Sequence, residues 1–384
     1  MSDRLRAFPF VLAAGVSAAL VLAAPFIGEI RRTLLIRFPG QFVRIIGAIV
    51  LASALLAIAA AVVRIRERKA LRYAGVVTAV AIAVGYAFIT RTDDPQVNAV
   101  QSFHFIEYGL VTVLFWFAWR PAGDASSLVL PVLAGLLVGT VEEWFQWFIP
   151  VRVGEVRDVF LNGVAIGCGL IFSLALHPPS RTHMVFTPAA RRRNHAFAGM
   201  VVVVFGAFFQ SVHLGYAIDG PQQSAFRSGY TAADLDRLSA DRAERWRGET
   251  VGRPPRLSAE DQYMTEGHWH VARRNEAWAA GDVAGAWHEN LILERYFAPV
   301  LDTPSYLSAT GHRWSEGHRA DAEQRYAAAP LIRYESQAHP SAIHVWPRSA
   351  YWLVVGGAAV LLAAPWFRHR LSPAREGGLS ASSV

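Results

Sequence analysis

The chain has 384 residues, of which 53% are hydrophobic and only 17% are charged, whereas a soluble protein carries roughly 25% charged residues. Several windows of about 20 residues carry no charge, which is the length that crosses a hydrocarbon core, so this composition excludes an ordinary soluble protein and indicates a multi-pass membrane protein. The net charge of +7 is typical of the basic excess that membrane proteins carry, and no basic stripe interleaved with aromatic residues indicates a nucleic-acid partner.

The apolar stretches predict about eight transmembrane spans. In chain order they are 8–28, 42–63, 73–90, 103–119, 127–149, 158–177, 195–214 and 349–367. The first follows basic residues as a signal peptide would, but it is long and has no small-residue cleavage site before a soluble chain. We therefore expect it to be retained as the first span.

The positions of arginine and lysine predict the orientation, because cytoplasmic loops carry an excess of both. With the N-terminus inside, basic clusters such as 64–72 and 191–193 face the cytoplasm. The first external loop disagrees, since it holds four arginines, Arg31, Arg32, Arg37 and Arg44. The later loops agree with one another, so we expect a protein of the plasma (inner) membrane with both termini in the cytoplasm.

A long polar segment, 215–348, separates the seventh and eighth spans and is then extracytoplasmic. Capping patterns predict helices that begin near Thr231, Ser258 and Asp282. The predicted fold is therefore an all-α integral membrane protein with a mostly helical extracytoplasmic domain. The expected divisions are 1–72, 73–177, 178–214, 215–348 and 349–384.

One stretch of the polar segment, 260–275, is dense in histidine, arginine and tryptophan. Glu266 and His270 are four residues apart and could share a metal ion or a proton, whereas His268 and His270 point to different sides of a helix, unlike the histidine pair of zinc proteases. The favoured interpretation makes Trp269 and its neighbours Trp278 and Trp287 core residues, with the histidines and arginines on a polar face. Binding of a polar ligand or partner is the remaining alternative.

Polar groups inside spans are costly and usually functional, and here they concentrate in the fourth, fifth and sixth spans. Helical spacing places them on shared faces, and the proposed topology brings all three sets to the extracytoplasmic end of the bundle. The link between the fifth and sixth spans adds further charges. The predicted cluster comprises His104, Tyr108, Glu143, Gln146, Arg152, Glu155, Arg157, Asp158 and Asn162.

Some of these groups have a purely structural alternative. Gln146 and Asn162 could simply hold helices together through hydrogen bonds, each worth about 0.6 kcal/mol in a membrane. For Glu143 and Asp158 we favour a role with a substrate or an ion. Glu142 is expected to face away from Glu143, because adjacent helical residues lie about 100° apart.

Two further patterns have structural interpretations. Trp144 and Trp147 are expected in the aromatic belt at the membrane boundary. Glycines at a spacing of four indicate close helix contact rather than a site. These are Gly135, Gly139, Gly163 and Gly167.

The order of these residues resembles the VanZ family, which is named for a protein linked to resistance to the glycopeptide antibiotic teicoplanin. The matching positions are His104, Glu143, Gln146, Pro150, Arg152, Glu155, Asp158, Asn162 and Gly167. The resemblance covers roughly 73–177 and implies a four-helix membrane module that acts on the cell envelope. The chain departs from the family where polar and apolar residues replace an Asp-Lys pair around Val100 to Ser102, and where Ala165 replaces a glycine.

Three functions remain open. In the first, which is the leading hypothesis, the protein binds or modifies an envelope component at the outer leaflet, such as a membrane lipid or a lipid-linked precursor. Arg152 and Arg157 would attract an anionic group of that component. Glu143 and Asp158 would hold polar or cationic groups, and His104 would orient or shuttle a proton. In the second, His104, Glu143 and Asp158 are the acid/base groups of an intramembrane enzyme. A transporter is the third, although no inverted repeat is evident.

The sequence gives no sign of a cofactor or a metal. Its single cysteine, Cys168, lies in an apolar run, so no intrachain disulfide is possible. No Cys/His spacing supports thiol-based metal or redox chemistry. No catalytic residue can be assigned from a triad or a metal signature.

Overall fold

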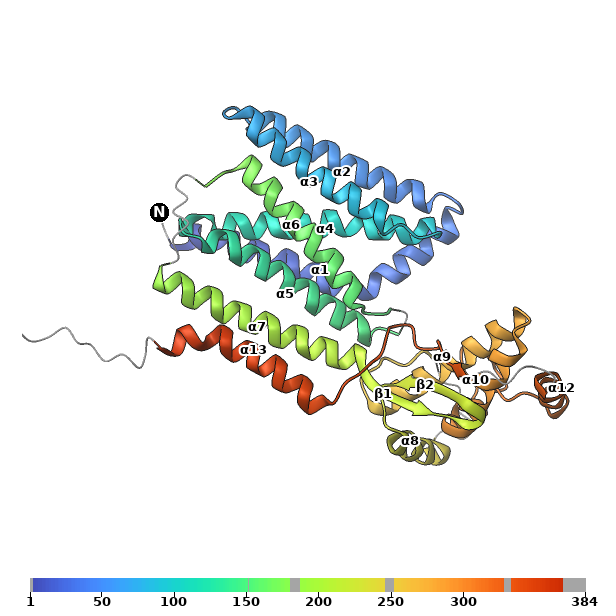
Figure 1. Ribbon diagram of the computed structural model, residues 1–384. Coiled ribbons are helices and arrows are strands. Elements are labelled where there is room, and N and C mark those ends of the chain that lie inside the picture. The colour runs from blue at the N-terminus through green and yellow to red at the C-terminus, as the bar shows by residue number, and fades with distance from the viewer. Residues whose placement is uncertain (1–2, 151, 180–186, 246–251, 328–332, 369–384) are drawn as a thin grey trace, which may run out of the picture.

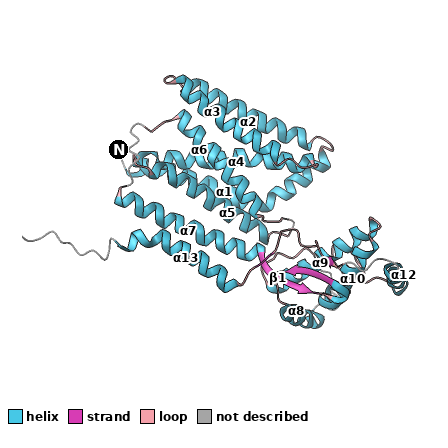
Figure 2. Cartoon of the chain, viewed as in Figure 1, coloured by secondary structure: helices cyan, strands magenta, loops and turns pink. Residues whose placement is uncertain are grey.

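The computed structural model describes residues 3–150, 152–179, 187–245, 252–327 and 333–368. It contains a bundle of long helices and a smaller polar domain at one end of that bundle (Figures 1 and 2). The N-terminal end of α1 and the C-terminal end of α13 lie together at the opposite end (Figure 1).

Seven helices of the described chain are long and apolar enough to cross a membrane. They are α1 (Asp3–Arg37), α2 (Phe42–Arg64), α3 (Lys69–Ile89), α4 (Pro95–Trp119), α5 (Ser126–Phe148), α6 (Val156–Leu176) and α7 (Pro188–His213). The first seven predicted spans are therefore confirmed as helices. α4 begins eight residues before the predicted residue 103, because Asp94 accepts a hydrogen bond from the Gln96 N–H at 2.7 Å and Pro95 is compatible with a first turn.

The last helix, α13 (Arg348–Arg368), has a shorter apolar stretch, Arg348–Ala364. It runs antiparallel along α7. The Tyr351 hydroxyl donates to the Gly206 carbonyl at 2.9 Å, and further along the pair Gly199 faces Ala359. The absence of a side chain at Gly206 matters, because a Cβ there would lie 2.8 Å from Val355.

The core of the bundle consists of α4, α5 and α6. Half of the apolar window of α6 is buried inside the protein, compared with 6% of that of α2, so the first helices cover the outside. α4 and α5 both pack on α6, and α7 packs on α5. Three of the four predicted glycine contacts are present, since a Cβ at Gly135 would meet Ile166, one at Gly139 would meet Asn162 and one at Gly163 would meet Leu136. Gly167, in contrast, faces open space.

The polar domain combines helices with a sheet of four short strands. Its helices are α8 (Ala232–Arg245), α9 (Ala259–Ala279), α10 (Val283–Tyr296), α11 (Ala298–Asp302) and α12 (Glu316–Ala327). Its strands are β1 (Leu214–Asp219), β2 (Ser224–Ser228), β3 (Tyr334–Glu335) and β4 (His344–Val345), in the order β3-β2-β1-β4. β1 and β2 are antiparallel, and the two outer pairs are parallel.

The three helices expected from capping patterns are present. Thr231 and Asp234 exchange the hydrogen bonds of a capping box, and Ser258 and Asp282 accept from the backbone three residues on. The sheet was not predicted. It covers a core in which Phe226 from β2 packs with residues of α9 and α10.

Candidate functional site

The predicted residues meet where α4 begins, α5 ends and α6 begins, at the end of the bundle that carries the polar domain. They separate into two groups by exposure. An inner network is at most 7% exposed and comprises His104, Tyr108, Glu142, Glu143, Gln146 and Asn162. A rim is half-buried or exposed and comprises Arg152, Glu155, Arg157 and Asp158.

Hydrogen bonds connect the inner network to the rim. The Tyr108 hydroxyl donates to Glu142 at 2.6 Å, and the Gln146 amide donates to the other oxygen of Glu142 at 2.7 Å. The guanidinium of Arg152 donates twice to the Gln146 carbonyl oxygen, at 3.0 and 2.6 Å. A continuous chain therefore runs from α4 through α5 to the link between α5 and α6.

His104 joins the same network from the other side. Its Nδ1 lies 2.8 Å from the Asn162 carbonyl oxygen, and its ring stacks on Tyr108 with centroids 6.3 Å apart. The Asn162 amide nitrogen is buried and has no hydrogen-bond partner within the described chain. It packs against Gly139, where a Cβ would lie 3.1 Å from this nitrogen and 3.2 Å from Tyr108.

Glu143 is completely buried beneath the link between α5 and α6. It accepts a hydrogen bond from the Glu155 backbone N–H at 3.2 Å. The link can approach this closely because residue 154 is a glycine: a Cβ on Gly154 would collide with the backbone carbonyl oxygen of Glu143. Gly154 is a site-forming residue that sequence reasoning missed.

Glu142 and Glu143 face different neighbours, as predicted, but Glu142, which the predicted cluster omitted, also belongs to the inner network. Glu142 contacts α4 through Tyr108, whereas Glu143 contacts the link through Glu155. Gln146 lies four residues after one and three after the other, so its amide reaches both carboxyl groups, at 2.7 and 3.5 Å. The 100° between adjacent residues places the two carboxyls against different neighbours, and both neighbours belong to the cluster.

The rim carries both signs of charge. Burial and the nearby Asp158 raise the pKa of Glu155, which Arg157 opposes. Among the described residues, the side chains of Arg157 and Asp158 take part in no hydrogen bond or ion pair.

The polar domain is attached directly to this end of α5 through Arg256. Its buried guanidinium lies 4.5 Å from the Trp147 ring centre and donates to the backbone carbonyls of Trp147, Ile149 (3.0 Å) and Arg152 (2.5 Å). Burial lowers the pKa of Arg256 to about 10. Trp147 is only 5% exposed and also packs on Trp269 of α9, so the belt position predicted for Trp147 is wrong.

A second attachment is made by His213, at the end of α7. Its Nε2 accepts from the Val156 N–H at 3.0 Å, and its Nδ1 lies 3.0 Å from the carbonyl oxygen of Ala342. The two bonds fix the tautomer with the proton on Nδ1, and they tie the start of α6 to the strand β4 region. No motif in the sequence singled out His213 or Arg256.

The histidine-rich stretch of α9 is buried rather than a polar face, so that part of the prediction is wrong. His270 pairs with Glu289 of α10 at 2.6 Å instead of sharing a ligand with Glu266, whose side chain bonds to Ser228. Within the described residues, no three His, Cys, Asp or Glu side chains are grouped to hold a metal ion. Trp287 is 1% exposed and is a core residue, as predicted.

The chain is thus a multi-pass membrane protein in which three spans enclose a buried polar network, and the polar domain is attached beside it at the end of α5. The rim above that network carries Arg157 and Asp158, whose side chains have no hydrogen-bond or ion-pair partner among the described residues. Compared with known proteins, the chain matches no family model, no curated protein and no solved structure.

Proposed function

We propose that this chain is a VanZ-like protein of the plasma membrane that binds the polar headgroup of a membrane lipid or lipid-linked envelope component at the outer leaflet. In this proposal α13 is an eighth span, both termini are cytoplasmic and the polar domain lies outside. The antiparallel contact of α13 along α7, and the position of the start of α1 and the end of α13 at the same end of the bundle, support an even number of spans.

The observation that carries the proposal is the contrast between the inner network and the rim. The carboxyl groups of Glu142 and Glu143 are buried and accept hydrogen bonds from protein groups, whereas Arg157 and Asp158 have no such partners among the described residues. Arginine recognises phosphate through its planar donors, and a carboxylate accepts from an ammonium or a hydroxyl group. The rim therefore suits a zwitterionic headgroup.

The inner network has a positioning role in this proposal. Gln146 holds the guanidinium of Arg152, and Glu142 in turn holds the Gln146 amide. A side chain as long as arginine loses up to about 2 kcal/mol of rotamer freedom when it is fixed. Fixing Arg152 before the ligand arrives moves that cost from binding to folding.

An intramembrane enzyme is the second candidate, and one observation favours it. Glu142, Glu143 and His104 bring three groups that can gain or lose a proton into one buried network, as general acid–base chemistry requires. The two candidates differ in turnover, because only an enzyme converts its lipid-linked substrate. If the wild type converts the substrate and Glu143→Gln still binds it but no longer converts it, the enzyme is favoured.

The headgroup proposal can be tested with the purified full-length chain in nanodiscs, using phosphatidylethanolamine and phosphatidylglycerol as probes. We expect a preference for phosphatidylethanolamine, which is weakened in Asp158→Asn and in Arg157→Gln. The matched controls Asp236→Asn and Arg295→Gln alter an exposed ion pair of the polar domain and should bind like the wild type. Equal binding of both lipids by all five proteins would contradict the proposal.

The resemblance to VanZ adds a cellular readout. Expression of the chain in a teicoplanin-susceptible host should raise the inhibitory concentration of the antibiotic, and Asp158→Asn should remove that effect. An unchanged inhibitory concentration would contradict the resistance role that the family name implies. It would not contradict lipid binding, which the nanodisc measurement tests separately.

A further inference from the structure

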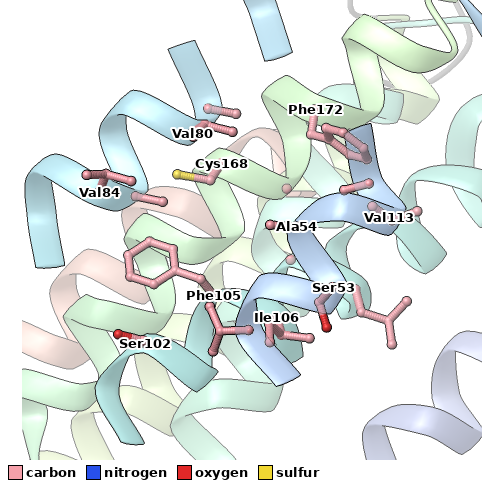
Figure 3. A pocket seen from close by; sticks show the side chains of 17 residues that line it. Ser53, Ala54, Val80, Val84, Ser102, Phe105, Ile106, Val113, Cys168 and Phe172 are labelled. Atoms are coloured by element: carbon pink, nitrogen blue, oxygen red, sulfur yellow. The ribbon is translucent and has the colours of Figure 1, made fainter. Parts of the chain in front are cut away.

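A cavity of about 450 Å³ lies among four membrane spans, outside the polar cluster. Figure 3 shows Val80 and Val84 of α3 on one side and Ser53 and Ala54 of α2 on the other. α4 and α6 supply the remaining walls. Its size falls within the range of about 300–1,000 Å³ that is usual for ligand pockets.

The cavity lies between α2 and α3, which make little direct contact with each other. They are joined by a tight turn in which Arg68 adopts the left-handed backbone conformation, with φ of 45°. Beyond the turn, α3 packs on α6 and α2 packs on α4 rather than on each other. The space between the two helices is therefore not filled by their own contact with each other and can hold a ligand.

The floor of the cavity separates it from the inner network. α4 and α6 approach so closely at Gly109 and Gly169 that a Cβ on Gly169 would lie 2.8 Å from the Gly109 carbonyl oxygen. Both glycines line the cavity, whereas Tyr108 of the inner network is fully buried and is not part of the lining. The cavity is thus a second feature with its own walls.

The chemistry of the lining points to a hydrocarbon chain. Apart from Ser53, Ser102 and Cys168, the lining consists of aliphatic, aromatic and glycine residues. An apolar cavity of this kind does not hold ordered water, which needs polar partners, and leaving it empty forfeits dispersion contacts on every wall. Because all four walls are membrane spans, the surrounding bilayer presents acyl chains to the opening at high concentration.

We propose that this cavity binds one acyl chain of a membrane phospholipid. Ser102 and Val84 mark the end of the cavity that is nearer the polar domain, since α4 begins and α3 ends on that side. The glycerol end of the lipid leaves there, and the chain runs inward past Phe105 toward Phe172 (Figure 3). This site goes beyond the headgroup site at the rim and does not require it.

The test uses the full-length chain in nanodiscs with a phosphatidylcholine that carries a photoreactive diazirine on one acyl chain. Two variants fill the cavity, Ala57→Phe from α2 and Ala83→Phe from α3. Two matched controls, Ala59→Phe and Ala81→Phe, place the same ring on the exposed side of the same helices. Melting temperatures of all four show which variants remain folded, and either filling variant is sufficient for the comparison.

After irradiation, adducts in the wild type are expected on lining residues such as Cys168 and Phe172. They should be lost in the filling variants and retained in the controls. Adducts that persist in a folded filling variant, or that are spread evenly over lipid-facing helices, would overturn the proposal. Displacement of the probe by an equimolar polyprenyl phosphate would also overturn it, because the occupant would then be an isoprenoid chain. Unchanged adducts in Asp158→Asn, a variant of the rim, would support an acyl-chain site that does not depend on the headgroup site.

Discussion

The guanidinium of Arg256 lies 4.5 Å from the ring centre of Trp147 and donates to the carbonyls of Trp147 and Ile149 at the C-terminal end of α5. A helix end leaves its last carbonyls without partners, and a cation is favoured there by the helix dipole. A residue of the polar domain therefore completes the helix that carries the two buried glutamates. The arrangement makes the site depend on a segment about a hundred residues away in the chain.

Replacing this arginine should loosen the attachment. Arg256→Lys keeps the charge but has a single donor centre in place of the fork that reaches several carbonyls. Because buried carbonyls lose their partners, we expect a loss of about 3 kcal/mol in the free energy of unfolding, measured by denaturation in detergent. Arg295→Lys, in an exposed pair with Asp236, is the matched control and should cost less than about 1 kcal/mol. Equal losses in both variants would show that Arg256 has no special role.

Gly154 is the second position at which a small change should disturb the site. Gly154→Ala forces the link away from Glu143 and breaks the bond from the Glu155 N–H, at an expected cost of about 2 kcal/mol from overpacking. Gly167→Ala is the control, because a Cβ at Gly167 meets nothing within 4 Å. In a helix interior that change should stabilise by about 0.5–1 kcal/mol. Melting curves should therefore move in opposite directions.

The positions of the cluster could be predicted from sequence because helical spacing fixes which residues share a face. His104 and Tyr108, four apart, do lie side by side, and both contact residues from other spans. Glu142 was omitted from the predicted cluster because helical spacing was applied only to the face of α5 that carries Glu143, although α5 has polar neighbours on two faces. A spacing of four to Gln146 was the signal that could have retained it.

Other features left no local signal. Arg256 is one arginine among many, and its partners are backbone carbonyls, which any residue can offer. The strands β3 and β4 are two residues long, too short for an alternating pattern. His270 was expected to be exposed, and it is buried because Glu289, 19 residues further along the chain, supplies its partner.

The hydrogen-bond chain through the inner network predicts energetic coupling. Glu142→Ala and Arg152→Ala act on the two ends of Gln146, so their combined effect on stability should differ from the sum by about 0.5–3 kcal/mol. The double variant of Glu142→Ala with Arg157→Ala should be additive, because Arg157 takes no part in this chain. Chemical denaturation of the wild type, the three single variants and the two double variants supplies both cycles. Additive effects in both cycles would mean that the hydrogen bonds from Glu142 through Gln146 do not fix the position of Arg152.

A buried histidine of the polar domain predicts acid sensitivity. Burial, and then the neighbouring His312, lower the pKa of His268 from 6.5 to about 4. Below pH 6.5 the His268 imidazole therefore binds a proton in the unfolded chain but not in the folded one. The free energy of unfolding consequently falls as the pH drops from 6.5 toward 4. The loss amounts to about 3 kcal/mol over that range. His268→Leu should flatten this slope, and the same slope in both proteins would refute the assignment.

The orientation of the polar domain is the prediction on which the outer-leaflet assignment depends. Ala240 is exposed on α8 of the polar domain, and Ala122 is exposed in the turn between α4 and α5 at the opposite end of the bundle. In a Cys168→Ala background, Ala240→Cys should react with a membrane-impermeant thiol reagent in intact cells, and Ala122→Cys only after lysis. The reverse pattern would place the domain in the cytoplasm, because one membrane separates the two positions. The rim would then face inner-leaflet lipids, and access to cell-wall precursors from outside would be excluded.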